Sequence, residues 1–172
     1  AGVPNAGVVR VFGESGGVWS EDTGRTIGNP AGAQANAYFG TAIVSESGNA
    51  DNAALYIGAP GAGVVGQGQV SYVVWSPTGN YQEVLLDPSQ LIAGDRYGGA
   101  LALRFGHLVV GAAGTDVTRD AIRHVDAGSA YVLQDGRGQN AVRVEPGAPV
   151  LNGWFGNSVA MGMALIESRP RS

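Results

Sequence analysis

The sequence contains no cysteine and no lysine, and all ten of its basic residues are arginine. Without cysteine the chain can form no disulfide, thiolate nucleophile or cysteine-bound metal site. Without lysine it can use neither Schiff-base chemistry nor a P-loop lysine. Charged residues make up only 14% of the chain and the net charge is −4, so nucleic acid is not an expected partner. No apolar run approaches the ~20 residues that cross a bilayer as a helix, so we expect no membrane span.

Helical periodicity is nearly missing as well. No window of about eleven residues repeats apolar positions at helical spacing without an internal glycine or proline. Short β-rich runs bounded by Gly, Pro, Asn or Asp occur instead, at spacings of roughly ten residues. These runs are 7–12, 41–44, 55–57, 70–75, 81–86, 100–103, 107–110, 129–133, 141–144 and 158–164. Together with 29 glycines among 172 residues, they predict an all-β chain of short strands joined by tight turns.

An aromatic-glycine step recurs at a fixed interval. The steps Phe39-Gly40, Tyr97-Gly98 and Phe155-Gly156 lie 58 residues apart. Each full interval holds four strand-like runs in the same order, and four strands cannot bury both faces of their sheet alone. Stacking neighbouring sheets radially buries those faces, as in the blades of a propeller. We therefore predict one β-propeller segment over 1–172, made of four-stranded antiparallel blades. It holds about three blades' worth of strands, with repeat starts near 39, 97 and 155 and partial blades at 1–38 and 155–172.

At these residues the chain resembles the FG-GAP repeat of integrin-α-like β-propellers, in particular those of bacterial secreted proteins. The match rests on the aromatic-glycine steps, on the Gly58-Ala59-Pro60 triplet and on 128–133, and it covers nearly the whole chain. The sequence departs from the consensus where Tyr97 replaces Phe and where 111–113 lacks the proline. The resemblance implies an extracellular or cell-surface protein, bacterial in origin, that acts as a non-catalytic binding or adhesion scaffold for a protein or glycan ligand.

Two further roles remain open alongside the adhesion scaffold. One is an accessory carbohydrate- or lipid-binding domain of a secreted enzyme, and the other is a structural subunit of an extracellular assembly. Because propellers usually need 4–8 blades to close, and this family typically has seven, we expect further polypeptide or additional copies of the chain to complete the ring. Such partners would cover the edges of the first and last strands, since unpaired strand edges recruit other chains.

Calcium is the cofactor that the resemblance brings into question, and no other cofactor is expected. Calcium-binding blades of this family carry an acidic loop between the first and second strands, and Ca²⁺ needs 6–8 oxygen ligands. The corresponding loop offers Glu46, Asn49, Asp51 and Asn52 as candidate metal ligands. Aligned on the consensus, three ligand positions have no side-chain oxygen, so we expect a solvated polar turn and no tight calcium binding. The equivalent loop of the next repeat, 104–106, has no carboxylate.

Other candidate sites favour structural explanations. The run 61–66 spells G-x-G-x-x-G, but a strand follows it where a dinucleotide site needs a helix. Asp116, Asp120 and Asp126 lie in a long loop, 114–127, that could hold a ligand or metal or could be a polar loop only. No nucleophile elbow, histidine metal pair or defensible carboxylate pair occurs, so we expect no catalytic residues and no enzyme activity.

The aromatic residues are expected to serve packing. Phe39, Tyr97 and Phe155 should occupy equivalent buried positions, one in each repeat. Trp154 should pack between blades in preference to forming a platform for a sugar, Trp75 should sit in or beside a strand, and Trp19 should lie in a turn.

Overall fold

The computed structural model describes residues 2–46, 54–74, 82–86, 91–134 and 141–162. Within these ranges the chain is all-β and contains no helix, and so none that is long and apolar enough to cross a membrane. The strands are β1 (Phe12–Ser15), β2 (Val18–Glu21), β3 (Ile43–Glu46), β4 (Ala54–Ala59), β5 (Gln69–Val74), β6 (Gln82–Leu86), β7 (Tyr97–Arg104), β8 (His107–Ala112), β9 (Val117–Arg119), β10 (Ile122–His124), β11 (Ser129–Leu133) and β12 (Ala141–Val144).

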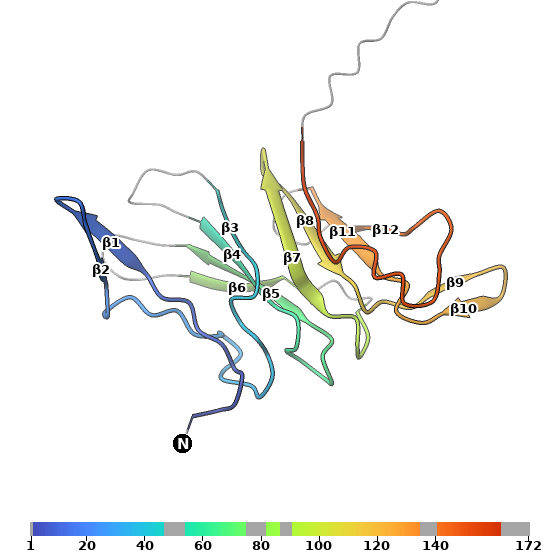
Figure 1. Cartoon of the computed structure of the whole chain (residues 1–172), viewed down its shortest axis with the longest axis horizontal. Coiled ribbons are helices and arrows are strands. Elements are labelled where there is room, and N and C mark those ends of the chain that lie inside the picture. Colours follow the sequence, from blue (N-terminus) through green and yellow to red (C-terminus); the bar gives the residue numbers. More distant parts are fainter. Residues whose placement is uncertain (1, 47–53, 75–81, 87–90, 135–140, 163–172) are drawn as a thin grey trace, which may run out of the picture.

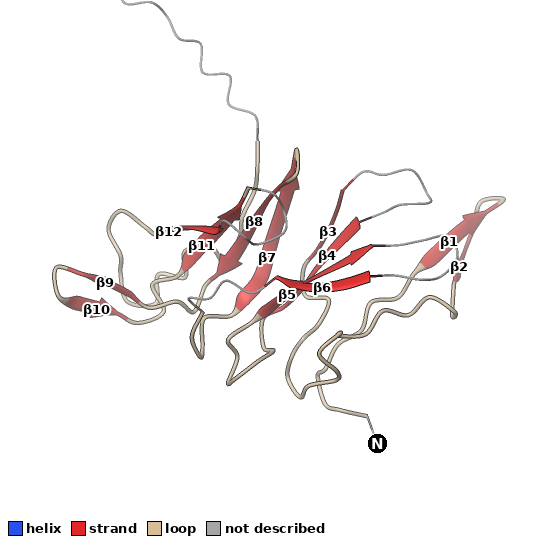
Figure 2. Cartoon of the chain, turned by 180° about the vertical axis from the view of Figure 1, so that it is seen from behind, coloured by secondary structure: helices blue, strands red, loops and turns tan. Residues whose placement is uncertain are grey.

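Two four-stranded antiparallel sheets form the centre of the molecule (Figure 1). Sheet one has the order β3-β4-β5-β6, and sheet two has the order β7-β8-β11-β12. Each sheet winds from its first strand to its fourth, and sheet two differs because the β9–β10 hairpin is inserted between its second and third strands. The β1–β2 hairpin lies beyond sheet one at one end of the molecule, and the β9–β10 hairpin lies at the other end (Figures 1 and 2). No sheet in the described ranges closes on itself.

Most of the predicted strands are present with shifted ends, but three expectations were wrong in part. The predicted strand 7–12 is reduced to single bridges at Gly7 and Val9, and the regular strand starts at Phe12. Trp19 lies in β2 and not in a turn. The described part of the run 158–164, residues 158–162, pairs with no strand, and the rest lies outside the described residues.

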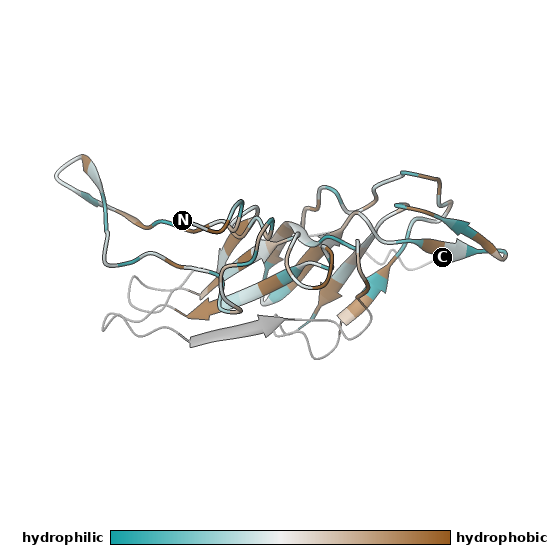
Figure 3. Cartoon of the chain, turned by 90° about the horizontal axis from the view of Figure 1, so that it is seen from below, coloured by the Kyte–Doolittle hydropathy of each residue, from teal (hydrophilic) through white to brown (hydrophobic). Residues whose placement is uncertain are grey.

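Successive side chains of a strand point to opposite faces of its sheet. In sheet one, buried residues lie on both faces. On one face, Ile57 of β4 and Val73 of β5 pack with Ile27 and Phe39 from the preceding segment. On the other face, Tyr56 and Val70 pack against sheet two. Their partners there are Leu91, Tyr97, Leu108, Val110, Ala112, Tyr131 and Leu133. Hydrophobic residues accordingly recur along the central strands when the molecule is viewed from below (Figure 3).

Glycines set the distance between neighbouring sheets. A Cβ added to Gly58 of β4 would lie 1.9 Å from the carbonyl oxygen of Gly98 in β7, and one added to Gly111 of β8 would lie 1.9 Å from that of Gly156. Each position therefore requires glycine, since real Cβ atoms do not approach a backbone oxygen so closely. The same backbone contact thus occurs twice, once in each full repeat.

Candidate functional site

One tight turn occurs three times, at the aromatic-glycine steps. Its first residue is Tyr38, Arg96 or Trp154, with φ angles of 53°, 56° and 49°. In each copy the carbonyl of that residue accepts a hydrogen bond from the N–H three residues on. The three bonds are Thr41 to Tyr38 at 3.1 Å, Gly99 to Arg96 at 3.3 Å and Asn157 to Trp154 at 3.0 Å. The turn directs its first side chain to solvent in all three copies.

A short backbone ladder holds each turn in this conformation, which non-glycine residues seldom adopt. In the middle copy, the N–H groups of Arg96 and Tyr97 donate to the carbonyls of Gly66 and Gln67, both at 3.1 Å. The parallel bridge between Gly68 and Tyr97 completes the ladder. The outer copies use residues 5–7 and 126–128 in the same way. These bonds offset the strain of the left-handed residue, which is of order 1–3 kcal/mol.

The aromatic residue that follows each turn's first position is buried in two copies and exposed in the third. Phe39 and Tyr97 are buried, with 3% and 0% of their surface exposed. Phe155 makes the same parallel bridge, to Gly128, but is 39% exposed. The prediction of three equivalent buried rings was therefore wrong for Phe155. The reason is that no described segment packs over it as Ile57 packs with Phe39.

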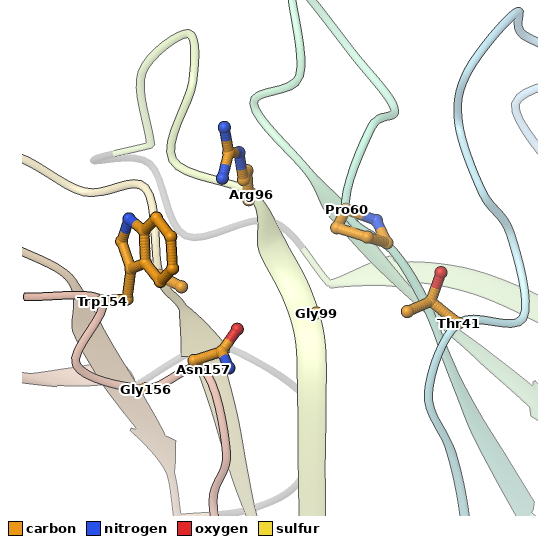
Figure 4. Close-up of a pocket in the computed structure, with 8 residues that line it drawn as sticks. Thr41, Pro60, Arg96, Gly99, Trp154, Gly156 and Asn157 are labelled. Carbon is orange, nitrogen blue, oxygen red and sulfur yellow. The ribbon is translucent and has the colours of Figure 1, made fainter. Parts of the chain in front are cut away.

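The three turns surround two adjoining pockets. The first has a volume of about 280 Å³ and takes residues from all three repeats (Figure 4). It is lined by Thr41, Pro60, Arg96, Gly99, Ala113, Trp154, Gly156 and Asn157. The second, of about 250 Å³, shares Pro60 and Arg96 with the first. Its other lining residues are Tyr38, Gly61, Val65, Gly66 and Gly94. We call the two pockets together the turn groove.

Aromatic and charged side chains alternate along the turn groove, in the order Tyr38, Arg96, Trp154. The two aromatic side chains are 49% and 51% exposed. Arg96 belongs to both pockets and is the charged residue among those that line them. Within the described part of the chain Arg96 forms no ion pair. Figure 4 shows the Arg96 and Trp154 side chains beside the same opening, with Asn157 below them.

Asp95 lies on the core side of Arg96 and is only 1% exposed. Burial raises the pKa of Asp95, while the hydrogen bond from the Ile92 N–H to Oδ2, at 2.8 Å, and the charge of Arg143 act against that rise. Oδ1 of Asp95 has no hydrogen-bond partner among the described residues. Because Asp95 is buried and lines neither pocket, the guanidinium of Arg96 is the charge presented to the groove.

The expectation that Trp154 packs between blades was wrong, since half of its surface is exposed at the groove. Trp75 lies outside the described residues. Tyr38 and Arg96 were not selected from the sequence as site residues. The signal that identifies them is their position: each stands immediately before an aromatic-glycine step, 58 residues apart and in line with Trp154.

The structure describes little of the candidate calcium loop. Glu46 is the last residue of β3, and Asn49, Asp51 and Asn52 lie outside the described residues. In the ranges that are described, no group of three or more His, Asp and Glu side chains is placed to hold a metal ion. Whether calcium binds at 46–52 therefore stays a prediction from the sequence.

The long loop 114–127 contains the β9–β10 hairpin, which Asp116 fastens at its base. Asp116 Oδ1 accepts the Asp126 N–H at 2.9 Å, and Oδ2 pairs with the Arg123 guanidinium. Burial alone would raise the pKa of Asp116, but these hydrogen bonds and the charge of Arg123 lower it. The carboxylate of Asp116 is thus used within the loop, while Asp120 occupies the turn between the two strands with a φ of 52°.

Comparison of the sequence with protein-family models and with curated proteins gives no match.

Proposed function

We propose that the chain is a segment of a β-propeller of the FG-GAP, integrin-α-like type, and that it serves as a non-catalytic binding scaffold outside the cell. The observation that carries this proposal is the threefold recurrence of the aromatic-glycine turn with the same ladder and the same left-handed first residue. Sheet one and sheet two repeat one strand order, and glycines at Gly58 and Gly111 set one spacing. Such repetition is typical of radially stacked blades.

A binding role is supported by what the repetition exposes. Loops on a rigid scaffold commonly carry binding residues, and pockets at the junction of repeated units are common ligand sites. The turn groove draws on all three repeats and presents two exposed aromatic side chains and an arginine. Aromatic residues and arginine dominate the energetics of recognition surfaces. The groove has no paired carboxylates or nucleophile-base pair among its lining residues, which favours binding over catalysis.

Electron microscopy of the particle that the chain forms in solution tests the architecture. Class averages with radial blades around a central axis are the expected result, with further polypeptide or further copies of the chain completing the ring. A particle in which the two sheets form a closed two-sheet sandwich would overturn the propeller.

Retention on immobilised extracellular polymers, both proteins and polysaccharides, tests the binding role. We expect Trp154→Ala to lose retention, because Trp154 lines the turn groove. Trp19→Ala is the matched control, since Trp19 is 70% exposed in β2 and away from the groove. Equal retention of both variants, or release of a cleaved product from the polymer, would contradict a non-catalytic scaffold that binds through this groove.

A further inference from the structure

We propose that the turn groove binds an acidic polysaccharide, and that Arg96 takes the carboxylate of a uronic acid residue. This inference rests on the binding role proposed above and names its ligand class. It starts from the charge at the centre of the groove. Arg96 is exposed, lines both pockets and has no ion-pair partner within the described residues. A guanidinium binds a carboxylate through two parallel hydrogen bonds, so an unpaired arginine in a pocket favours an anionic group of planar geometry.

The aromatic residues at the two ends of the groove favour a sugar ring beside that carboxylate. Tyr38 and Trp154 each expose about half of their surface. Tyrosine and tryptophan combine a large apolar face with a polar edge, which suits a ligand that has one apolar face and many hydroxyl groups. Pro60 and Gly99 also line the first pocket, and Asn157 adds an amide that can both donate and accept hydrogen bonds.

The repetition of the pockets favours a polymer with a repeating unit. The second pocket is built on Tyr38, Pro60 and Arg96. The first pocket contains the corresponding residues of the next repeat, Arg96, Ala113 and Trp154, so the two pockets match at these three positions and differ in the rest of their lining. Two adjoining pockets of similar volume, about 250 and 280 Å³, offer consecutive sites to consecutive sugar residues. A peptide would present a different side chain at each step, so the repeated pockets favour a polysaccharide over an acidic peptide.

The charge of the whole chain makes this prediction more specific. The net charge is −4, so no long-range attraction draws a polyanion to the protein. Binding must therefore depend on the local contact at Arg96. We expect a salt dependence equivalent to one or a few contacts, far weaker than that of proteins that bind polyanions with a broad basic surface.

Calorimetric titration with polygalacturonate, alginate and hyaluronan tests the inference, each beside its carboxyl-reduced form. Carboxyl reduction turns the uronic acid into the neutral sugar and leaves the linkages unchanged. We expect at least one of the three acidic polymers to bind and its reduced form to bind about tenfold more weakly or worse, because a charged hydrogen bond contributes about 1.5–3 kcal/mol. Poly-glutamate is included as the acidic peptide.

The variants separate the two recognition elements. Arg96→Gln should weaken binding of the acidic polymer about tenfold or more and leave binding of the reduced polymer unchanged. Its matched control is Arg104→Gln, since Arg104 lies at the opposite end of β7. The guanidinium of Arg104 lies over the Phe105 ring, 5.0 Å from the ring centroid. Trp154→Ala should weaken binding of both polymer forms, with Trp19→Ala as its control. Arg96→Lys, which keeps the charge without the two-pronged geometry, should fall between wild type and Arg96→Gln.

Each remaining outcome overturns the inference. Equal affinity for acidic and reduced polymers would show that the carboxylate is not recognised. Tight binding of poly-glutamate that is insensitive to Trp154→Ala would indicate an acidic peptide ligand. Failure of all three acidic polymers to bind would reject the ligand class. In that case, retention on a neutral or protein ligand that Trp154→Ala abolishes would still support the groove as a binding site, so the two proposals fail separately.

Discussion

Sheet one and sheet two share a frame and differ in what connects its strands. Both wind through four antiparallel strands, and both begin beside an aromatic-glycine turn. Between the second and third strands, sheet one has only the turn from Ala59 to Gln69, whereas sheet two inserts a hairpin between Ala112 and Ser129. The backbone contacts between neighbouring sheets, at Gly58 and Gly111, are thus fixed by sterics, while the connections between strands differ in length and structure.

Their buried interiors differ too. The residue immediately before the first turn residue differs between the two copies. It is Ala37, before Tyr38, in one copy and Asp95, before Arg96, in the next. Both Ala37 and Asp95 are buried. Sheet two therefore carries a buried carboxyl group where the corresponding place beside sheet one is apolar, so Asp95 gives sheet two a response to pH that Ala37 cannot give sheet one.

The largest effect is expected where a close backbone contact between the two sheets is disrupted. Gly68→Ala would place a Cβ 2.2 Å from the backbone nitrogen of Tyr97, so sheet one and sheet two would have to move apart. We expect a loss of about 3 kcal/mol or more in the free energy of unfolding, measured by urea denaturation. Gly94→Ala is the matched control, because Gly94 has the same φ of 92° but nothing within 4 Å of the added Cβ. It should cost only about 1–2 kcal/mol, and equal losses would show that the close approach is unimportant.

The next effect separates the buried ring of Phe39 from the exposed ring of Phe155. Phe39→Ala should destabilise the fold by about 3–5 kcal/mol, since the ring is buried. Phe155→Ala should cost about 1–2 kcal/mol, because 39% of the ring is already exposed. Trp19→Ala, at an exposed site, should stay within about 0.5 kcal/mol. Thermal unfolding gives the ranking, and a loss at Phe155 as large as at Phe39 would mean that further chain covers Phe155 in solution.

The next substitution removes the bonds by which Asp116 holds the β9–β10 hairpin, which is inserted in sheet two and has no counterpart in sheet one. Asp116→Asn should cost about 1.5 kcal/mol at pH 7, the low end for charged hydrogen bonds, because Arg123 is well exposed to solvent. The native pKa of Asp116 lies below its ordinary value of 3.8, so this contribution is complete above that value and is lost as the pH falls through the native pKa. Asp120→Asn should have little effect. A penalty for Asp116→Asn that persists at pH 2 would contradict the electrostatic cause.

Asp95 should give the opposite dependence on pH. Its native pKa is raised above 3.8, so its contribution is complete below that value and is lost as the pH rises through the native pKa. Asp95→Asn retains an oxygen to accept the Ile92 N–H and cannot ionise. We expect the variant to gain stability relative to wild type as the pH rises from 4 to 7, followed by thermal unfolding. A constant difference over that range would show that Asp95 does not titrate there.

The smallest expected effect is at the connection between first and second strands. In sheet one this is the loop with the candidate ligands Glu46, Asn49, Asp51 and Asn52, and in sheet two it is the turn at Phe105. We expect chelation to leave the melting temperature unchanged and calorimetry after chelation to show no tight calcium binding. Micromolar binding of one ion per chain would establish a calcium site in the first connection.

The sequence alone predicted the all-β class and most strands, because glycine punctuation and β-rich runs are local signals. It also located the three aromatic-glycine steps, which the structure forms as three turns of the same geometry, because their spacing is visible in the sequence. It could not reveal the exposure of Trp154, because the direction of that side chain depends on a φ of 49° held by hydrogen bonds from 27 or more residues away. The β9–β10 hairpin was missed because each of its strands has only three residues, too few for a periodic pattern.

The left-handed first residue of each turn has a consequence for how such surfaces change. The backbone at 38, 96 and 154 is fixed by the ladder, and its side chain leaves the frame without contributing to either core. Tyrosine, arginine and tryptophan already occupy these places on one unchanged frame. The three places can therefore carry different side chains on one backbone geometry: a library that varies them together, with the β-branched residues that a positive φ disfavours left out, would sample new specificities without altering either core.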